Sequence, residues 1–145
     1  MIKVGLGLLA ILLTAFLGAG IWFSKKSPTA TINKQVFKIE VASSSKDKQI
    51  GLSKYSKINN DFAMLFPFEK PDYYSFWMKE VQFPIDIIFI KDNKIVTIYR
   101  NVQPSKNNLI IYKPKTPSNK VIEINAGLSQ KYSFKEGNQI ELKNI

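Results

Sequence analysis

Two apolar runs separated by a two-residue turn place the strongest constraint on the fold of this chain. The runs IDIIFIK, residues 85–91, and KIVTIYR, residues 94–100, flank the turn formers Asp92 and Asn93. Two such residues between apolar runs are typical of a β-hairpin. The hairpin makes the two runs antiparallel neighbours, so the fold contains a sheet.

Further short strand candidates follow the same pattern. Apolar and polar side chains alternate at residues 36–42 and 120–126, and other candidates are 62–68, 73–79, 109–112 and 134–142. Pro67 is expected to end its strand or to place it at a sheet edge. Turn signals recur about every 8 to 12 residues, as in all-β domains. The sequence therefore predicts a mainly β fold, a small antiparallel β-sandwich or barrel-like domain.

One or two short helices complete this prediction. Ser44 and Asp47 have the spacing of a capping box, and Gly51 follows where a short helix would end. Residues 127–133, GLSQKYS, are expected to form one helical turn.

The N-terminal segment differs in kind from the rest. Residues 4–23 carry no charge, and about 20 apolar residues are needed to span a bilayer as a helix. We therefore predict three parts: a transmembrane anchor or signal segment at 1–25, a polar linker at 26–33 and a β-rich domain at 34–145.

The fate and orientation of this segment stay open at the level of residue patterns. A signal peptide cut after the small residues 18–20 is the alternative to an uncleaved anchor. The apolar run continues through residues 21–23, and Trp22 lies where an interfacial aromatic belongs, so the anchor is favoured. Lysines flank both ends, and charge alone does not decide which side of the membrane carries the domain.

Composition excludes several kinds of chemistry. The chain has no cysteine and no histidine, which excludes thiol catalysis, histidine-based triads and His-ligated zinc. No phosphate-binding glycine loop is present, and we expect no cofactor. The net charge of +10 favours anionic partners. Its lysines are scattered and Arg100 is the one arginine, so specific nucleic-acid binding is not expected, whereas a Lys-rich module that binds anionic polymer is an alternative function.

Charged residues interrupt the most apolar stretch, residues 74–90, which we interpret as two buried strands and a turn. Buried charges need partners. Asp86 could bond turn backbone N–H groups or pair with Lys79. Alternatively, both could form the polar floor of a ligand pocket. A third hypothesis is an envelope hydrolase that uses Glu80 and Asp86 as acid and base.

The order of several short motifs resembles the domain of unknown function 192 family. The chain has QIGLS, AMLFPF, FWMKE, FPIDIIFI, VIEINAG and EGNQIEL in the family's order, over about residues 36–143. The positions that match the family's pattern are Phe76, Trp77, Met78, Lys79, Pro84, Asp86, Asn125 and Gly127.

The resemblance implies a small, mainly β domain, often exported or membrane-anchored, and hence an extracytoplasmic domain here. It implies no established activity. Four places depart from the family's pattern: Ala63 stands for Gly, Ser53 for Met, Glu80-Val81 for Asn-Thr, and Asn138 for Asp.

From these observations we predict a membrane-tethered, non-catalytic binding module outside the cytoplasmic membrane. Its ligand would be a small polar molecule, a peptide or an envelope component. The predicted ligand-binding residues are Trp77, Met78, Lys79, Asp86 and Asn125, with no metal site. Asn125 either joins Lys79 and Asp86 in one polar cluster or caps the helical turn that follows it.

Overall fold

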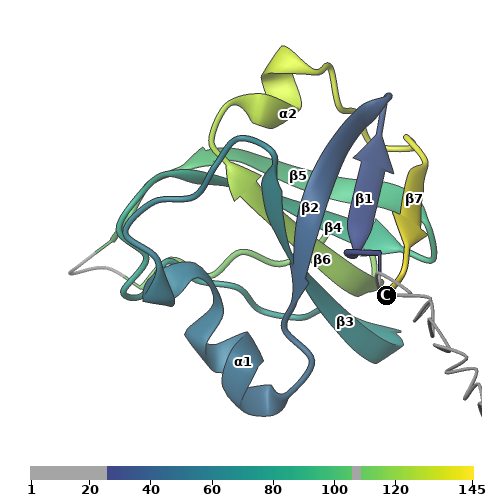
Figure 1. Cartoon of the computed structure of the whole chain (residues 1–145). Helices are drawn as coiled ribbons and strands as arrows, with labels where there is room; N and C mark the ends of the chain where they lie inside the picture. Colours follow the sequence, from purple (N-terminus) through teal and green to yellow (C-terminus); the bar gives the residue numbers. More distant parts are fainter. Residues whose placement is uncertain (1–25, 106–108) are drawn as a thin grey trace, which may run out of the picture.

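The computed structural model describes residues 26–105 and 109–145 (Figure 1). The predicted anchor or signal segment, 1–25, lies outside the described residues. Within the described part, no helix is both long enough and apolar enough to cross a membrane.

Seven strands and three short helical segments make up the domain. In chain order they are β1 (Thr29–Ile32), β2 (Gln35–Val41), α1 (Ser45–Ile50), a 3₁₀ helix (Gly51–Lys54), β3 (Phe62–Asp72), β4 (Ile85–Lys91), β5 (Lys94–Val102), β6 (Ser118–Asn125), α2 (Leu128–Lys131) and β7 (Ile140–Lys143).

All seven strands belong to one sheet, in the order β5-β4-β6-β3-β2-β1-β7. The predicted hairpin is confirmed as the antiparallel pair β4–β5. The pair β2–β3 is parallel, and the other neighbours are antiparallel. The mainly β prediction is thus confirmed, whereas a sandwich of two sheets and a wholly antiparallel arrangement are wrong. Because α1 lies in the connection from β2 to β3, the chain can return along the same direction.

The sheet curls until its two edges touch. The Ile95 N–H in β5 donates to the carbonyl of Asn138, 3.0 Å away, and the Gly137 N–H donates back to Ile95 at 2.8 Å. The Ile140 N–H in β7 donates to Asn93 at 2.9 Å. These bonds join the outermost strands at one end, so the sheet forms a partly closed barrel, with α2 over one end (Figure 1).

Two apolar clusters lie on the two faces of this sheet. The inner cluster contains Ile88 and Ile90 of β4 and Ile122 of β6. The outer cluster contains Ile87 and Phe89 of β4. Every residue of β4 except Lys91 is buried, because its neighbours and both clusters cover both faces. Both faces of this strand are therefore largely apolar.

Three details of the predicted elements change. Residues 73–79 are not a strand, because their contact with a strand partner is limited to one bridge, from Phe76 to Tyr112. The same bridge is what remains of the strand predicted at 109–112. Strand β1 lies within the predicted linker 26–33. It was not predicted because a four-residue strand buries two alternate side chains, which is too short a pattern to detect in a sequence.

Strand β3 continues through Pro67 to Asp72, so the proline does not end it. The last residue of β3 paired with β2 is Leu65, and its carbonyl accepts from the Ala42 N–H on that side. In a strand, alternate residues direct their backbone groups to the same side. The backbone N–H that Pro67 lacks would therefore point to the side of β2, which no longer pairs with β3 at this position. Since β6 is the one strand that still pairs with β3 here, Pro67 lies at a local sheet edge.

Candidate functional site

A pocket of about 160 Å³ lies on the outer face of the sheet. Its base comes from β3 and β6, and α1, the 3₁₀ helix and the loop 73–84 surround it. The apolar side chains that line it are Ile50, Leu52, Phe66, Phe68, Tyr74, Phe76, Trp77 and Val81. The polar ones are Lys48, Gln49, Ser75, Lys79 and Glu123.

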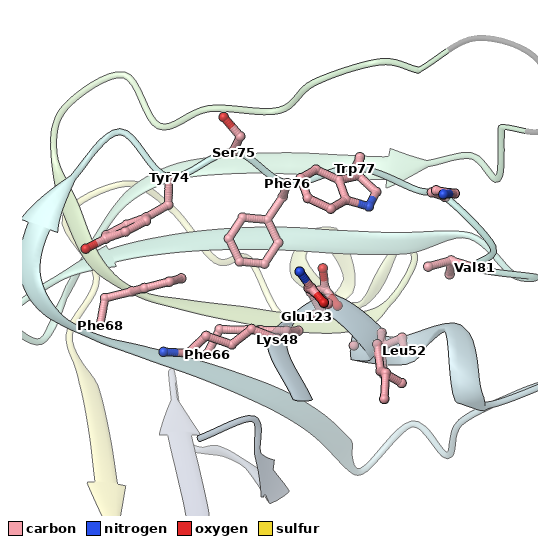
Figure 2. Close-up of a pocket in the computed structure, with 14 residues that line it drawn as sticks. Lys48, Leu52, Phe66, Phe68, Tyr74, Ser75, Phe76, Trp77, Val81 and Glu123 are labelled. Carbon is pink, nitrogen blue, oxygen red and sulfur yellow. The ribbon is translucent and has the colours of Figure 1, made fainter. Parts of the chain in front are cut away.

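Glu123 is the acidic residue of this pocket. Its side chain lies among the lining residues, beneath the rings of Phe76 and Trp77 (Figure 2). It is 4% exposed, and it forms no hydrogen bond or ion pair with any residue that the structure describes. Burial raises the pKa of this carboxyl to about 8. At neutral pH Glu123 is therefore mainly protonated and can donate a hydrogen bond to a bound molecule.

Strand pairing explains why Glu123 is buried. In the sheet, Glu123 lies between Met64 of β3 and Ile87 of β4. Both neighbours belong to the outer apolar cluster. A carboxyl group in such surroundings loses its water without gaining a partner, and this favours its uncharged form.

Aromatic rings build the wall above Glu123. The Phe76 ring packs edge-to-face on Phe66, with 5.0 Å between centroids, and on Phe89, at 5.6 Å. Phe68 and Tyr74 are stacked with centroids 3.6 Å apart. Mutual packing fixes these rings in place. The wall therefore exists before any ligand arrives.

Two lysines line the same pocket. The Lys48 ammonium, on α1, lies 4.6 Å from the centroid of the Phe68 ring. Lys79 lies in the loop 73–84 and is exposed. Neither lysine forms an ion pair with a carboxylate in the described part of the chain. Both are free to bind an anionic group.

The capping box that the sequence predicted forms at the start of α1, the helix beside the pocket. The Asp47 N–H donates to Ser44 Oγ at 3.0 Å, and the Ser44 N–H donates to Asp47 Oδ2 at 3.1 Å. Gly51 ends the helix with a φ of 49°. An added Cβ at Gly51 would lie 3.5 Å from the Phe66 ring. The helix thus ends where the backbone passes close to the Phe66 ring, at the edge of the pocket.

The structure brings together two of the five predicted site residues. Trp77, 40% exposed, and Lys79 both line the pocket. Met78, between them, points into the outer apolar cluster and is 2% exposed. Asp86 and Asn125 do not line the pocket. The expected polar cluster of Lys79, Asp86 and Asn125 is therefore not formed.

Asp86 braces two backbone segments, β5 and the start of α2. Its Oδ1 accepts from the N–H groups of Asn101, at 2.8 Å, and Gly127, at 3.1 Å. Its Oδ2 accepts from the Ser129 N–H at 2.9 Å. The side chain is fully buried. Of the two alternatives for this carboxylate, bonding to backbone N–H groups is the one observed, and no ion pair with Lys79 occurs among the described residues.

These contacts also bear on the hydrolase hypothesis. The Asp86 oxygens are occupied and away from the pocket, and Glu80 is exposed on a turn. The pair does not share a cavity in the described structure, so the geometry gives it no support as acid and base.

Asn125 fixes a loop and not a ligand site. Its Nδ2 donates to the Ile58 carbonyl at 2.9 Å and to Asn60 Oδ1 at 2.8 Å. Helix α2 begins at Gly127 without a side-chain cap of its own. The Asp86 carboxylate satisfies the N–H groups at that helix start, so the capping role expected for Asn125 belongs to Asp86.

Sequence reasoning missed Glu123. The alternation in residues 120–126 suggests a strand with one solvent face, and Glu123 falls on that face. However, β6 lies between β3 and β4 and both of its faces are covered. The described residues contain no group of three or more acidic side chains that could hold a metal ion.

Comparison with known families agrees with this β domain. The family known as domain of unknown function 192, described as "Uncharacterized ACR", matches residues 28–142. The chain belongs to this family. The match begins just before β1 and ends within β7, so the family unit corresponds to the complete sheet.

Two solved structures resemble the domain. One is a protein of unknown function from Novosphingobium aromaticivorans, 30% identical, with a TM-score of 0.70 over 79% of this chain and 83% of that one. The other is a putative transcription regulator from Sinorhizobium meliloti, 26% identical, with a TM-score of 0.73 over 82% and 95%. No curated protein matches the chain.

Proposed function

We propose that this protein is a membrane-tethered binding module whose pocket around Glu123 receives a small ligand. One observation carries the proposal: a carboxyl group is buried in an apolar pocket without a partner. The loss of most of the water around this carboxyl, with no hydrogen-bond partner from the described chain, has a free-energy cost. A ligand that supplies the missing hydrogen-bond partner would remove this cost, and a ready-made aromatic wall would hold its apolar part.

Trp77 provides a direct test. In a Trp22→Phe background, Trp77 is the one tryptophan of the full chain. We expect 2-phenylethanol, an uncharged probe with one ring, to change its fluorescence in a saturable way. Val81→Phe should block this change by filling the pocket. Val36→Phe, the same substitution at an exposed site in β2, serves as the control. Equal binding to both variants, or no saturable binding at all, would reject the proposal.

The membrane tether is the second part of the proposal. We propose a single-pass protein of the cell membrane with its domain outside. Two features support this: residues 4–23 carry no charge, and the family resemblance implies a domain that is often exported or membrane-anchored. A cleaved, secreted form is the alternative. Because the chain has no cysteine, one introduced cysteine is a unique label.

We expect a membrane-impermeant maleimide to label Lys70→Cys in intact cells and Ile2→Cys after permeabilisation only. The reverse pattern would place the domain in the cytoplasm. Loss of about the first 20 residues from the mature protein, measured by mass spectrometry, would support cleavage instead of anchoring.

A further inference from the structure

We infer that the ligand of this pocket is a small zwitterion, an apolar body with one amine and one acid group, such as an apolar α-amino acid. The inference rests on the proposed function, since it assigns a chemical class to the same pocket. Three features carry it: the buried Glu123 carboxyl, the aromatic faces around it and the two unpaired lysines.

The amine would lie at Glu123. Carboxyl groups combined with aromatic faces are a recurring means of binding organic cations. The pocket already shows this affinity, because the Lys48 ammonium lies over the Phe68 ring at 4.6 Å. An ammonium group beside Glu123 would form the hydrogen bond that the carboxyl lacks.

The acid group would lie at the lysines. Lys48 and Lys79 line the pocket from α1 and from the loop 73–84, and neither is paired with a carboxylate among the described residues. A ligand with an amine alone would be repelled by both lysines. A ligand with an acid alone would leave Glu123 unsatisfied. A zwitterion matches both.

The size of the pocket limits the apolar body. A protein cavity of about 150 Å³ can hold a benzene molecule. The pocket here, about 160 Å³, therefore suits a single ring or a branched aliphatic chain. A longer ligand would extend past the exposed Trp77 into solvent.

Binding of an ammonium group should release a proton. The charged and titratable groups that face Glu123 across the pocket are Lys48 of α1 and Tyr74 and Lys79 of the loop 73–84. The residues beside it on β3 and β4 are apolar. Without ligand Glu123 holds its proton at neutral pH, and a neighbouring positive charge favours the carboxylate. Affinity for the amine should consequently increase between pH 6 and about 8.

Four matched probes separate the contributions: L-phenylalanine, 2-phenylethylamine, 3-phenylpropionate and 2-phenylethanol. They carry both charges, the amine alone, the acid alone and neither. With the full chain in detergent and Trp77 as reporter, we expect phenylalanine to bind most tightly. Calorimetry in buffers of different ionisation enthalpy should detect a proton that passes from the protein to the buffer when either amine binds. The other two probes should release no such proton.

Matched variants test each end of the ligand. Glu123→Gln should weaken phenylalanine and phenylethylamine about tenfold or more, as expected for a charged hydrogen bond, and leave phenylpropionate unchanged. The double variant Lys48→Gln/Lys79→Gln should weaken phenylalanine and phenylpropionate instead. Lys70→Gln, an exposed lysine of β3 outside the pocket, should change neither.

The outcomes distinguish the two proposals. If phenylethanol binds in the pocket but the charged probes gain nothing, the zwitterion inference is wrong and the pocket function stands. Tighter binding of phenylpropionate than of phenylalanine would also overturn the inference, in favour of a ligand acid bonded to protonated Glu123. If Val81→Phe affects none of the four probes, both proposals fail.

Discussion

A buried acid without a partner makes stability depend on pH, and Glu123 is such a residue. Its folded pKa of about 8 lies above the ordinary value of 4.5. Between these values the folded state binds more protons than the unfolded state. As far as Glu123 is concerned, the free energy of unfolding is therefore highest below about pH 4.5. It falls progressively as the pH rises to about 8.

We expect the free energy of unfolding of Glu123→Gln to rise relative to the native chain across this range. The slope should not exceed about 1.4 kcal/mol per pH unit. Urea denaturation at pH 5, 6, 7, 8 and 9 measures it. A difference that stays constant with pH would mean that Glu123 titrates normally in the folded state.

Glu80 shows how a family preference can reflect the backbone. Its φ of 63° lies in the left-handed region, which asparagine tolerates better than glutamate. The resembling family has asparagine at this position. Because Glu80 does not line the pocket, its departure from the pattern bears on the turn and not on the ligand.

We predict that Glu80→Asn stabilises the fold by about 0.5–1 kcal/mol through relief of this strain. Glu80→Gln removes the same charge without the conformational preference and should have almost no effect. Chemical denaturation of the three proteins makes the comparison. An equal gain from both variants would assign the effect to charge.

Asp86 is expected to contribute more to folding than to binding. Asp86→Asn places an amide where three N–H groups converge, so at least one buried N–H loses its acceptor. The loss should be about 2–4 kcal/mol in the free energy of unfolding. Glu80→Gln again serves as the exposed control. If Asp86→Asn were as stable as the native chain, the bracing role described above would be wrong.

Individual residues were the least predictable part of this protein. Trp77 and Lys79 stand out in the sequence because an aromatic side chain and a lysine in an apolar stretch are conspicuous, and both line the pocket. Asp86 was also conspicuous, but a sequence does not reveal that β5 and the start of α2 bring backbone N–H groups to its side chain. Glu123 was missed because alternation gives the two faces of a strand and not whether both are covered.

Among the elements, α1 matters most for the pocket, since it carries Lys48 and leads into Gly51. A six-residue helix is too short to be stable alone. Its capping box and the 3₁₀ helix that follows it must hold it. The sequence predicted this element well, because caps are local and their residues are adjacent in the chain.

Ser44→Ala should therefore loosen α1 selectively. Loss of an N-cap serine costs about 1 kcal/mol, and we expect faster amide hydrogen exchange in residues 45–50 with little change in β4. Ser56→Ala, an exposed serine in the following loop with no side-chain bond among the described residues, provides the control. Uniform acceleration over the whole domain would contradict a local role.

At the scale of the whole molecule, the sheet edges meet through the loop that precedes β7. Gly137 has a φ of 91° and donates its N–H to Ile95 at 2.8 Å. Nothing lies within 4 Å of an added Cβ there. An alanine at this position is thus strained by its backbone and not by a clash.

We predict that Gly137→Ala destabilises the fold by about 1–3 kcal/mol. Lys135→Ala, an exposed side chain two positions earlier, should have little effect. Thermal denaturation provides the measurement. A neutral Gly137→Ala would mean that the backbone at this position is not strained by a side chain.

This closure could not be predicted from the sequence. Strand patterns indicated a mainly β domain, and the hairpin β4–β5 followed from two adjacent runs. The parallel pair β2–β3 and the contact between β5 and β7 depend on pairings between distant segments, for which one sequence carries no periodic signal.

The pairing of β1 with β7 has a consequence for the time course of folding. Thr29 lies opposite Lys143 and Ile32 opposite Ile140, so one side of the first strand stays unpaired until the last strand is synthesised. Contacts between distant segments form slowly because they must close a long loop. A nascent chain that still lacks residues 140–143 can pair β1 with β2, but the other side of β1 has no partner and the sheet is unfinished. The sheet is therefore completed only when β7 joins the free side of β1.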